Sequence, residues 1–278
     1  MAHPIEKALQ RAREEGQTKL QFGENRAEAK KPALEVVHTP VPLSTSEVRY
    51  WRTQSWPLTP QQLLENRIVV GSEDAPGAAA FNILRTRIMQ KMQTEGWQTL
   101  LVTSARDNAG KSLVAANLAV AMARDRNHTV MLVDADMRRP SIHQFYNYPL
   151  GSGFAELLRG EKTVEDVLFH PGIERLVVLP GGQPITDSAE WMASSEMENW
   201  LQEAVSRYED RLIIIDAPPL LNVDDTLNLL PKVDAFLLVV DEGGVSESDV
   251  AHCLELCKDA ELLGTVLNRS ADPQPDPY

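Results

Sequence analysis

The stretch 104-SARDNAGKSLVAANL-118 decides the fold of this chain, because it has the layout of a phosphate-binding loop. An apolar run precedes the loop, and a helix-like run over 113–123 follows it directly. A loop of this kind needs backbone N–H groups aimed inward, an ammonium group, and the N-terminus of a helix behind them. The stretch departs from the usual pattern at Ala105, where that pattern has a glycine. Whether the loop binds a nucleotide therefore depends on what the neighbouring strand ends carry.

Three consecutive residues of this loop suit the binding of a nucleoside triphosphate. Gly110 lets the backbone approach the phosphates closely, and Lys111 supplies a positive charge for the β- and γ-phosphates. The hydroxyl of Ser112 can ligate Mg²⁺. A strand before this loop and a helix after it complete the order that phosphate binding requires, so the sequence predicts a nucleotide site.

Apolar strands and helical patterns alternate along the rest of the chain. Continuous runs of Leu, Ile and Val indicate strands buried on both faces, and their alternation with helices predicts an α/β fold. Its sheet is expected to be doubly wound and mainly parallel, with helices on both sides. The predicted strands cover 98–104, 129–135, 175–180, 211–216, 235–241 and 262–268. The predicted helices cover 78–96, 111–125, 154–159, 163–169, 188–206, 222–230 and 246–258.

The composition divides the chain into three parts. Residues 1–58 are interpreted as a short amphipathic helix, 4–15, followed by a polar, proline-containing flexible linker. The P-loop domain is predicted to span 59–270, opening with a helix that has Thr59 as N-cap and Pro60 at its first position. Residues 271–278 form an expected flexible tail. The aromatic patch 50-YWRTQSW-56 either docks on the domain or a partner, or packs loosely.

Carboxylates stand at the ends of two further predicted strands, where ligands of parallel α/β sheets bind. Asp134 and Asp136 are alternate residues of an extended segment and can point the same way, toward a shared cation. The alternative is a helix-capping residue beside a surface residue. Arg138 follows them and can face phosphate, and Asp216 ends the apolar run 212–215. A lone carboxylate at such a strand end suits a Mg²⁺ site.

Charge and composition exclude several other classes of protein. The net charge of −13 gives little electrostatic support for binding nucleic acid. No run of about 18 apolar residues predicts a membrane-spanning helix, so a cytoplasmic protein is expected. Cys253 and Cys257 lie four residues apart on a predicted helix and are interpreted as partly buried thiols, because they are too few for a structural zinc site.

The three motifs, in this order, resemble those of the bacterial tyrosine kinases of polysaccharide export. These enzymes form the CpsD/CapB-like branch of the MinD/ParA group of P-loop ATPases, and the resemblance covers about residues 76–270. It extends to 83-ILRTRI-88, 178-VLPGG-182 and 262-LLGTVLN-268. Members of the family often lack the leading glycine, so Ala105 is tolerated. The opening 5-IEKALQRA-12 resembles the exosortase-associated branch of these autokinases.

The resemblance implies ATP and Mg²⁺ as cofactors and assigns a role to each motif residue. Asp134 is implied as the base that receives the tyrosine proton. Asn268 is implied to contact adenine, with a simple strand-end cap as the alternative. The residues implied to organise Mg²⁺ are Ser112, Asp136 and Asp216. Those implied to hold the phosphates are Asn108, Ala109, Gly110, Lys111, Ser112 and Leu113.

The family also implies a partner, namely a membrane chain-length-determinant or activator protein that recruits the kinase to the inner face of the membrane. The C-terminal tail carries one tyrosine, Tyr278, where family members usually have a cluster of phosphate acceptors. The family's ring-contact motif is reduced to Arg85, because Ala79 and Asn82 stand at its other two positions. A homo-oligomer is therefore one possibility rather than a firm expectation. Two alternatives stay open: a MinD/ParA-like regulatory ATPase, and an ATP-binding scaffold without kinase activity.

Overall fold

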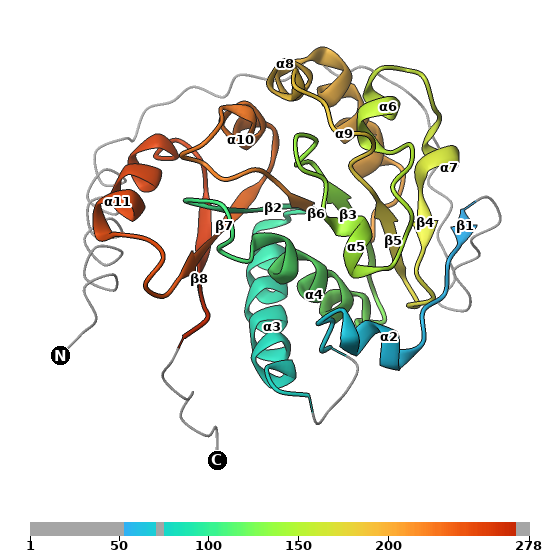
Figure 1. The fold of residues 1–278 in the computed structure, drawn as a ribbon, viewed down its shortest axis with the longest axis horizontal. Helices are drawn as coiled ribbons and strands as arrows, with labels where there is room; N and C mark the ends of the chain where they lie inside the picture. The colour runs from blue at the N-terminus through green and yellow to red at the C-terminus, as the bar shows by residue number, and fades with distance from the viewer. Residues whose placement is uncertain (1–52, 71–74, 271–278) are drawn as a thin grey trace.

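The computed structural model describes residues 53–70 and 75–270, which form one layered α/β unit (Figure 1). The predicted helix 4–15, most of the predicted linker and the tail with Tyr278 lie outside these residues. A sheet runs through the middle of the unit, and helices lie on both of its faces.

The sheet has eight strands in the order β1-β4-β5-β3-β6-β2-β7-β8. Neighbouring strands are parallel except for β4 and β5, which are antiparallel. The predicted doubly wound and mainly parallel sheet is therefore confirmed. The strands are β1 (Gln54–Ser55), β2 (Thr99–Ser104), β3 (Thr129–Asp134), β4 (Phe169–His170), β5 (Leu176–Leu179), β6 (Arg211–Asp216), β7 (Ala235–Asp241) and β8 (Leu262–Asn268).

Two apolar cores, one on each face, hold the helices against the sheet. On one face α3, α4 and α5 cover the sheet, and on the other face α6 to α11 do so. All residues of β2, β3 and β7 are buried, which explains why their central residues form continuous apolar runs rather than an alternating pattern. The helices are α2 (Pro60–Glu65), α3 (Ala78–Glu95), α4 (Lys111–Ala123), α5 (Ile142–Phe145), α6 (Phe154–Leu158), α7 (Val164–Val167), α8 (Ser188–Ala193), α9 (Ser195–Ser206), α10 (Asp225–Leu229) and α11 (Glu247–Leu256), and a 3₁₀ turn covers Leu230–Lys232.

Local signals for the ends of two helices are confirmed. Thr59 is the N-cap of α2, and its hydroxyl accepts a hydrogen bond from the backbone N–H of Gln62, with Pro60 at the first helical position. Gly96 ends α3 in the left-handed conformation, with φ of 71°. The sequence thus defines these boundaries through side-chain and glycine chemistry that acts within a few residues.

Two predicted helices differ from the structure. The predicted helix 188–206 is two helices, because Ser194 is extended and caps α9 by accepting the N–H of Met197. The predicted helix 163–169 ends at Val167, and Phe169–His170 forms β4 instead. A two-residue strand has no periodicity of its own, so only its pairing with β1 and β5 defines it.

The packed structure begins before Thr59. Strand β1 lies parallel to β4, and the N–H of Trp56 donates to the carbonyl oxygen of His170 at 2.8 Å. The ring of Trp56 meets that of Tyr148 edge-on with centroids 5.5 Å apart, and Tyr148 stacks on Phe169 at 3.9 Å. This end of the aromatic patch therefore docks on the domain, which is one of the two interpretations that the sequence left open.

Candidate nucleotide-binding site

The phosphate loop lies between the end of β2 and the start of α4. Two of its residues are left-handed: Asn108 with φ of 63° and Gly110 with φ of 91°. Helix α4 begins at Lys111, directly after the loop, so its N-terminal N–H groups face the loop. Ala105 and Ala109 are fully buried. A side chain at 105 is thus accommodated in the core and does not project into the loop, consistent with the missing glycine being tolerated.

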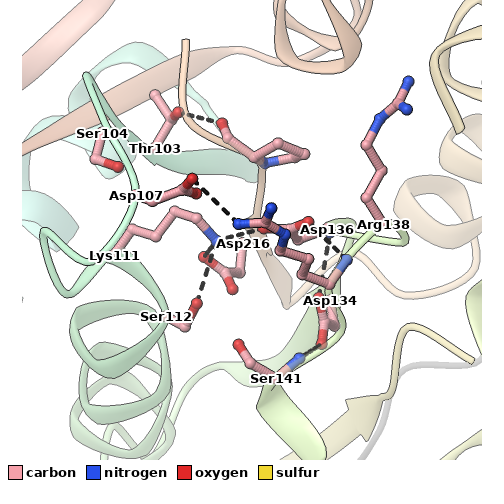
Figure 2. Close-up of polar contacts among 12 residues, drawn as sticks. Thr103, Ser104, Asp107, Lys111, Ser112, Asp134, Asp136, Arg138, Ser141 and Asp216 are labelled. Carbon is pink, nitrogen blue, oxygen red and sulfur yellow. Dashed lines mark hydrogen bonds and ion pairs between the residues drawn. The ribbon is translucent and has the colours of Figure 1, made fainter. Parts of the chain in front are cut away.

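Three predicted site residues surround the ammonium group of a fourth, Lys111 (Figure 2). Its Nζ lies 2.9 Å from Oδ2 of Asp136 and 3.4 Å from Oδ1 of Asp216. The hydroxyl of Ser112 is 3.2 Å from the same nitrogen. The residues come from the ends of β3 and β6 and from the helix that follows β2, three strands that are adjacent in the sheet. The sheet order therefore brings together side chains that are up to 105 residues apart in sequence.

Burial and charge act against each other in this cluster. Burial alone would lower the pKa of Lys111, but the charges of Asp216 and Asp136 offset it and raise that pKa above its ordinary value. Burial raises the pKa of Asp216, against the favourable charge of Lys111. The second oxygen of Asp216, Oδ2, is buried without a hydrogen-bond partner. An unpartnered buried carboxylate oxygen is costly unless a cation approaches it.

These oxygens fit a magnesium ion that comes with a nucleotide. Mg²⁺ prefers oxygen ligands and is commonly held by one or two carboxylates together with phosphates and waters. Ser112, Asp136 and Asp216 supply one hydroxyl and two carboxylates around a point that already holds a cation. Within residues 53–70 and 75–270 no group of three or more His, Cys, Asp or Glu side chains forms a metal site by itself. A magnesium site that is completed by the phosphate oxygens of a nucleotide agrees with the oxygens around Lys111. It also agrees with the lack of a metal site built from these side chains alone in the described residues.

Asp134 lies beside this cluster but is held by the backbone. Its Oδ2 accepts the N–H groups of Ser141 at 2.8 Å and Ile142 at 2.9 Å, and its Oδ1 accepts the N–H of Asp136 at 3.2 Å. The side chain is completely buried, and burial together with the charge of Asp216 raises its pKa to about 8. The sequence left open that Asp134 caps a helix. Its bonds to the N–H groups of Ser141 and Ile142 agree with this in part, since Ser141 is the N-cap of α5.

The two arginines after Asp136 point to different places. The guanidinium of Arg138 extends away from the phosphate loop, where its Nε lies 3.1 Å from Asp225 and its Nη1 donates to the carbonyl oxygen of Thr186 at 2.8 Å (Figure 2). Arg138 is therefore engaged by Asp225 in this structure, and its predicted contact with phosphate remains a prediction. Arg139 turns to the loop instead, with its Nη1 3.2 Å from Oδ2 of Asp107.

Asn268, at the end of β8, contacts the phosphate loop itself. Its side-chain N–H donates to the carbonyl oxygen of Ala109 at 2.8 Å. The residue therefore lies next to the loop, as the sequence predicts for the end of the last strand. Its predicted contact with adenine remains a prediction.

Several residues that shape the site carry no motif of their own. Asp107 accepts hydrogen bonds from Asn222 and Arg139, and Arg106 forms a two-pronged ion pair with Asp249 at the start of α11. Asp107 and Arg106 stand inside the loop sequence, so their position marks them as candidates. Their partners, 115 and 143 residues away, could not be named without the fold.

A parallel sheet with this loop, a lysine at the helix start and carboxylates on two neighbouring strand ends defines a P-loop ATPase. The comparison with known families agrees, since residues 98–262, more than half of the chain, match the AAA domain.

The most informative relatives are bacterial tyrosine kinases. The putative tyrosine-protein kinase CapB of Staphylococcus aureus is 31% identical over 191 residues, which cover 68% of this chain and 82% of CapB. The tyrosine-protein kinase YwqD of Bacillus subtilis is 29% identical over 74% of this chain and 87% of YwqD. Some relatives are longer: the match to the putative tyrosine-protein kinase EpsB of Ralstonia solanacearum covers 31% of EpsB. The chain belongs to the CapB-like family of bacterial tyrosine-protein kinases.

Solved structures place the fold in the same group. The chimerical protein CapA2B2 matches with a TM-score of 0.69 and 30% identity, over 79% of this chain and 94% of that one. The kinase domain of the Escherichia coli tyrosine kinase ETK shares the fold with a TM-score of 0.67 at 24% identity, over 81% of this chain and 94% of that one. MinD of Pyrococcus horikoshii, solved with Mg-ADP, matches with a TM-score of 0.53, over 63% of this chain and 71% of MinD.

Proposed function

We propose that the protein is an ATP-dependent protein-tyrosine autokinase that regulates the polymerisation or export of an exopolysaccharide. The observation that carries the proposal is the convergence of Ser112, Asp136 and Asp216 on the ammonium of Lys111, in a chain of the CapB-like family. Phosphoryl transfer depends on positioning and charge neutralisation, and this cluster is suited to both.

The residues of the phosphate loop bind and orient the donor. Lys111 and the backbone N–H groups of 108–113 hold the phosphates of ATP, with Gly110 allowing the close approach. Ser112, Asp136 and Asp216 would hold Mg²⁺, which would neutralise charge on the phosphate oxygens. Lys111, which lies between the two carboxylates in this structure, would contact the β- and γ-phosphates.

Asp134 is assigned as the base. A carboxylate has about four acceptor sites. Three backbone N–H groups use three of them in this structure, and we assign the fourth to the acceptor hydroxyl. The tyrosine oxygen loses its proton to Asp134 and forms the bond to the γ-phosphorus, while the bond from that phosphorus to the β–γ bridging oxygen of ATP breaks. The three backbone contacts fix the carboxylate, so its position does not depend on a flexible side chain.

Tyr278 is assigned as the acceptor. It follows Asn268 by ten residues, and a fully extended chain of that length spans at most about 36 Å. This reach is consistent with transfer to the site of a neighbouring copy.

The partner is assigned from the family resemblance as a membrane chain-length-determinant or activator protein, which recruits this chain to the inner face of the membrane. The described part of the chain has no helix that is both long enough and apolar enough to cross a bilayer. The similar structure CapA2B2 is that of a chimerical protein, which supports a partnered arrangement for this family.

Intact-mass spectrometry after incubation with Mg-ATP tests the proposal. We expect a gain of one phosphate in the wild-type chain, and no gain in Lys111→Met or Tyr278→Phe. Lys91→Met is the matched control, because the ammonium of Lys91 is half-exposed and pairs with Glu95 on the surface of α3. A gain that survives Tyr278→Phe but not Lys111→Met moves the acceptor to another residue. ATP hydrolysis without any gain in mass would replace the kinase by a regulatory ATPase.

A further inference from the structure

Asp225 is a buried carboxylate outside the three nucleotide motifs. It is the first residue of α10, is completely buried, and lies 3.1 Å from Nε of Arg138. The hydroxyl of Ser188, the first residue of α8, also donates to it. A buried charge is expensive unless it is paired and hydrogen-bonded, and both conditions are met here. The arrangement thus joins three separate segments at one carboxylate.

Through Arg138, Asp225 reaches the segment that carries Asp136. Arg138 is two residues after Asp136, and its Nη1 also donates to Thr186. A backbone hydrogen bond links the same two segments, since the N–H of Ile185 donates to the carbonyl oxygen of Met137 at 3.0 Å. The position of the turn after β3 is therefore fixed by contacts with α10 and with the segment before α8.

Through its neighbour Thr226, the same end of α10 reaches the segment that carries Asp216. The hydroxyl of Thr226 donates to the carbonyl oxygen of Pro218 at 2.6 Å. The hydroxyl of Thr103, on β2, donates to the same oxygen at 2.7 Å. Pro218 is two residues after Asp216, so the start of α10 contacts the chain just beyond both carboxylates that approach Lys111.

We propose that Asp225 is a positioning residue of the nucleotide site, which sets Asp136 relative to Asp216 by holding Arg138 away from the phosphates. It lies outside the three nucleotide motifs and acts through Arg138. The inference rests on the magnesium–nucleotide site of the proposed function and does not depend on transfer to tyrosine. Residues that orient the ligands of a metal typically change its affinity 10- to 100-fold when they are replaced.

The test is Asp225→Asn, which keeps the size of the side chain and removes its charge. Ser188→Ala is the matched control, because it removes a second contact of Asp225 and leaves the pair with Arg138. The readout is the Mg²⁺ concentration that half-saturates the binding of a fluorescent ATP analogue to the full chain, together with binding of the analogue in EDTA. We expect Asp225→Asn to require about tenfold more Mg²⁺ with little change in EDTA, and Ser188→Ala to stay within about twofold of wild type.

Tighter binding of ATP by Asp225→Asn would contradict the inference most clearly. If Arg138 were a phosphate ligand, releasing it from Asp225 would tighten the binding of ATP, and this result would overturn the inference. An unchanged Mg²⁺ requirement, or equal losses with Mg²⁺ and with EDTA, would overturn it as well, since a merely structural residue affects both. If Asp225→Asn does not fold, Arg138→Lys serves in its place and should also raise the Mg²⁺ requirement. For that variant, an unchanged Mg²⁺ requirement, or equal losses with Mg²⁺ and with EDTA, would overturn the inference.

The proposed kinase function can be refuted independently of this inference about Asp225. A wild-type chain without phosphotyrosine but with Mg²⁺-dependent nucleotide binding would refute the kinase and leave this test intact. Nucleotide binding that is independent of Mg²⁺ in the wild type would overturn both.

Discussion

The side-chain amide nitrogen of Asn268 lies 2.8 Å from the carbonyl oxygen of Ala109, and it also fills the space beside Gly110. A Cβ atom at position 110 would come within 2.2 Å of that nitrogen. The end of β8 therefore constrains the phosphate loop at the glycine that precedes Lys111.

Gly110→Ala is expected to impair both folding and nucleotide binding. The position has φ of 91°, which costs a residue with a Cβ about 1–2 kcal/mol, and the contact with Asn268 adds to this cost. Because the amide of Asn268 must move to relieve the contact and then loses its hydrogen bond to Ala109, we expect the affinity for ATP to fall at least about tenfold. Urea denaturation and titration with a fluorescent ATP analogue measure the two effects.

Gly160→Ala is the matched control for this change. Gly160 has φ of 71°, and a Cβ there would meet nothing within 4 Å, so only the backbone cost applies. Equal losses of stability in the two variants would show that the contact with Asn268 has no effect. In the double variant Gly110→Ala/Asn268→Ala, the loss should be smaller than the sum of the two single losses, since the second change removes the obstructing group.

Lys111→Met should destabilise the nucleotide-free protein and make it respond to Mg²⁺ alone. Without the ammonium, the buried carboxylates of Asp136 and Asp216 lose their cation, and breaking such a pair typically costs about 3–5 kcal/mol. Since Mg²⁺ can replace the lost charge, it should raise the melting temperature of the variant more than that of the wild type. Differential scanning calorimetry with and without Mg²⁺ measures this. Lys91→Met should behave like the wild type, and an equal response of all three proteins would contradict the prediction.

The clustering of Lys111, Asp136 and Asp216 could be predicted from the sequence, because each residue occupies a position that the fold makes special. Lys111 stands at a helix start, and Asp136 and Asp216 follow buried strands, so a parallel sheet brings them to one edge. The direction of Arg138 could not be predicted, because Asp225, its partner, is 87 residues away on a five-residue helix. Strands β1 and β4 could not be predicted either, since two residues show no periodicity.

Trp56→Ala is expected to destabilise the domain by roughly 2 kcal/mol, from lost ring contact and buried apolar area. Trp56 meets Tyr148 edge-on, and its backbone continues the pairing of β1 with β4. Urea denaturation of the full chain measures the loss. Tyr148→Phe is the control, because it keeps the ring stack on Phe169 and removes only the hydrogen bond to Gln54, at 3.0 Å. If both variants lose less than about 0.5 kcal/mol, a range usual for surface changes, residues 54–58 do not contribute to the fold.

The two cysteines should be unreactive in the folded protein. Burial raises the pKa of Cys253 to about 11 and that of Cys257 to about 12, so at pH 8 only about one thiol in a thousand of Cys253 is the reactive thiolate. Because the pKa values of both thiols lie well above 8, the rate at which the thiols are labelled should rise roughly tenfold for each pH unit above 8. Labelling with a thiol-specific disulfide reagent, followed over time, measures this. Both thiols should react at once in guanidinium chloride, and fast labelling of the native protein at pH 8 would refute the prediction.

The order of the strands separates the two ends of the described chain. Residue 53 leads into β1 at one edge of the sheet, and residue 270 follows β8 at the other edge. Eight strands spaced about 4.8 Å apart put these edges roughly 34 Å from each other. A protein bound at residues 53–56 would therefore contact the edge of the sheet that lies away from β8. Contacts at one of these edges leave the other accessible, so the two flanks of the described unit can be occupied independently.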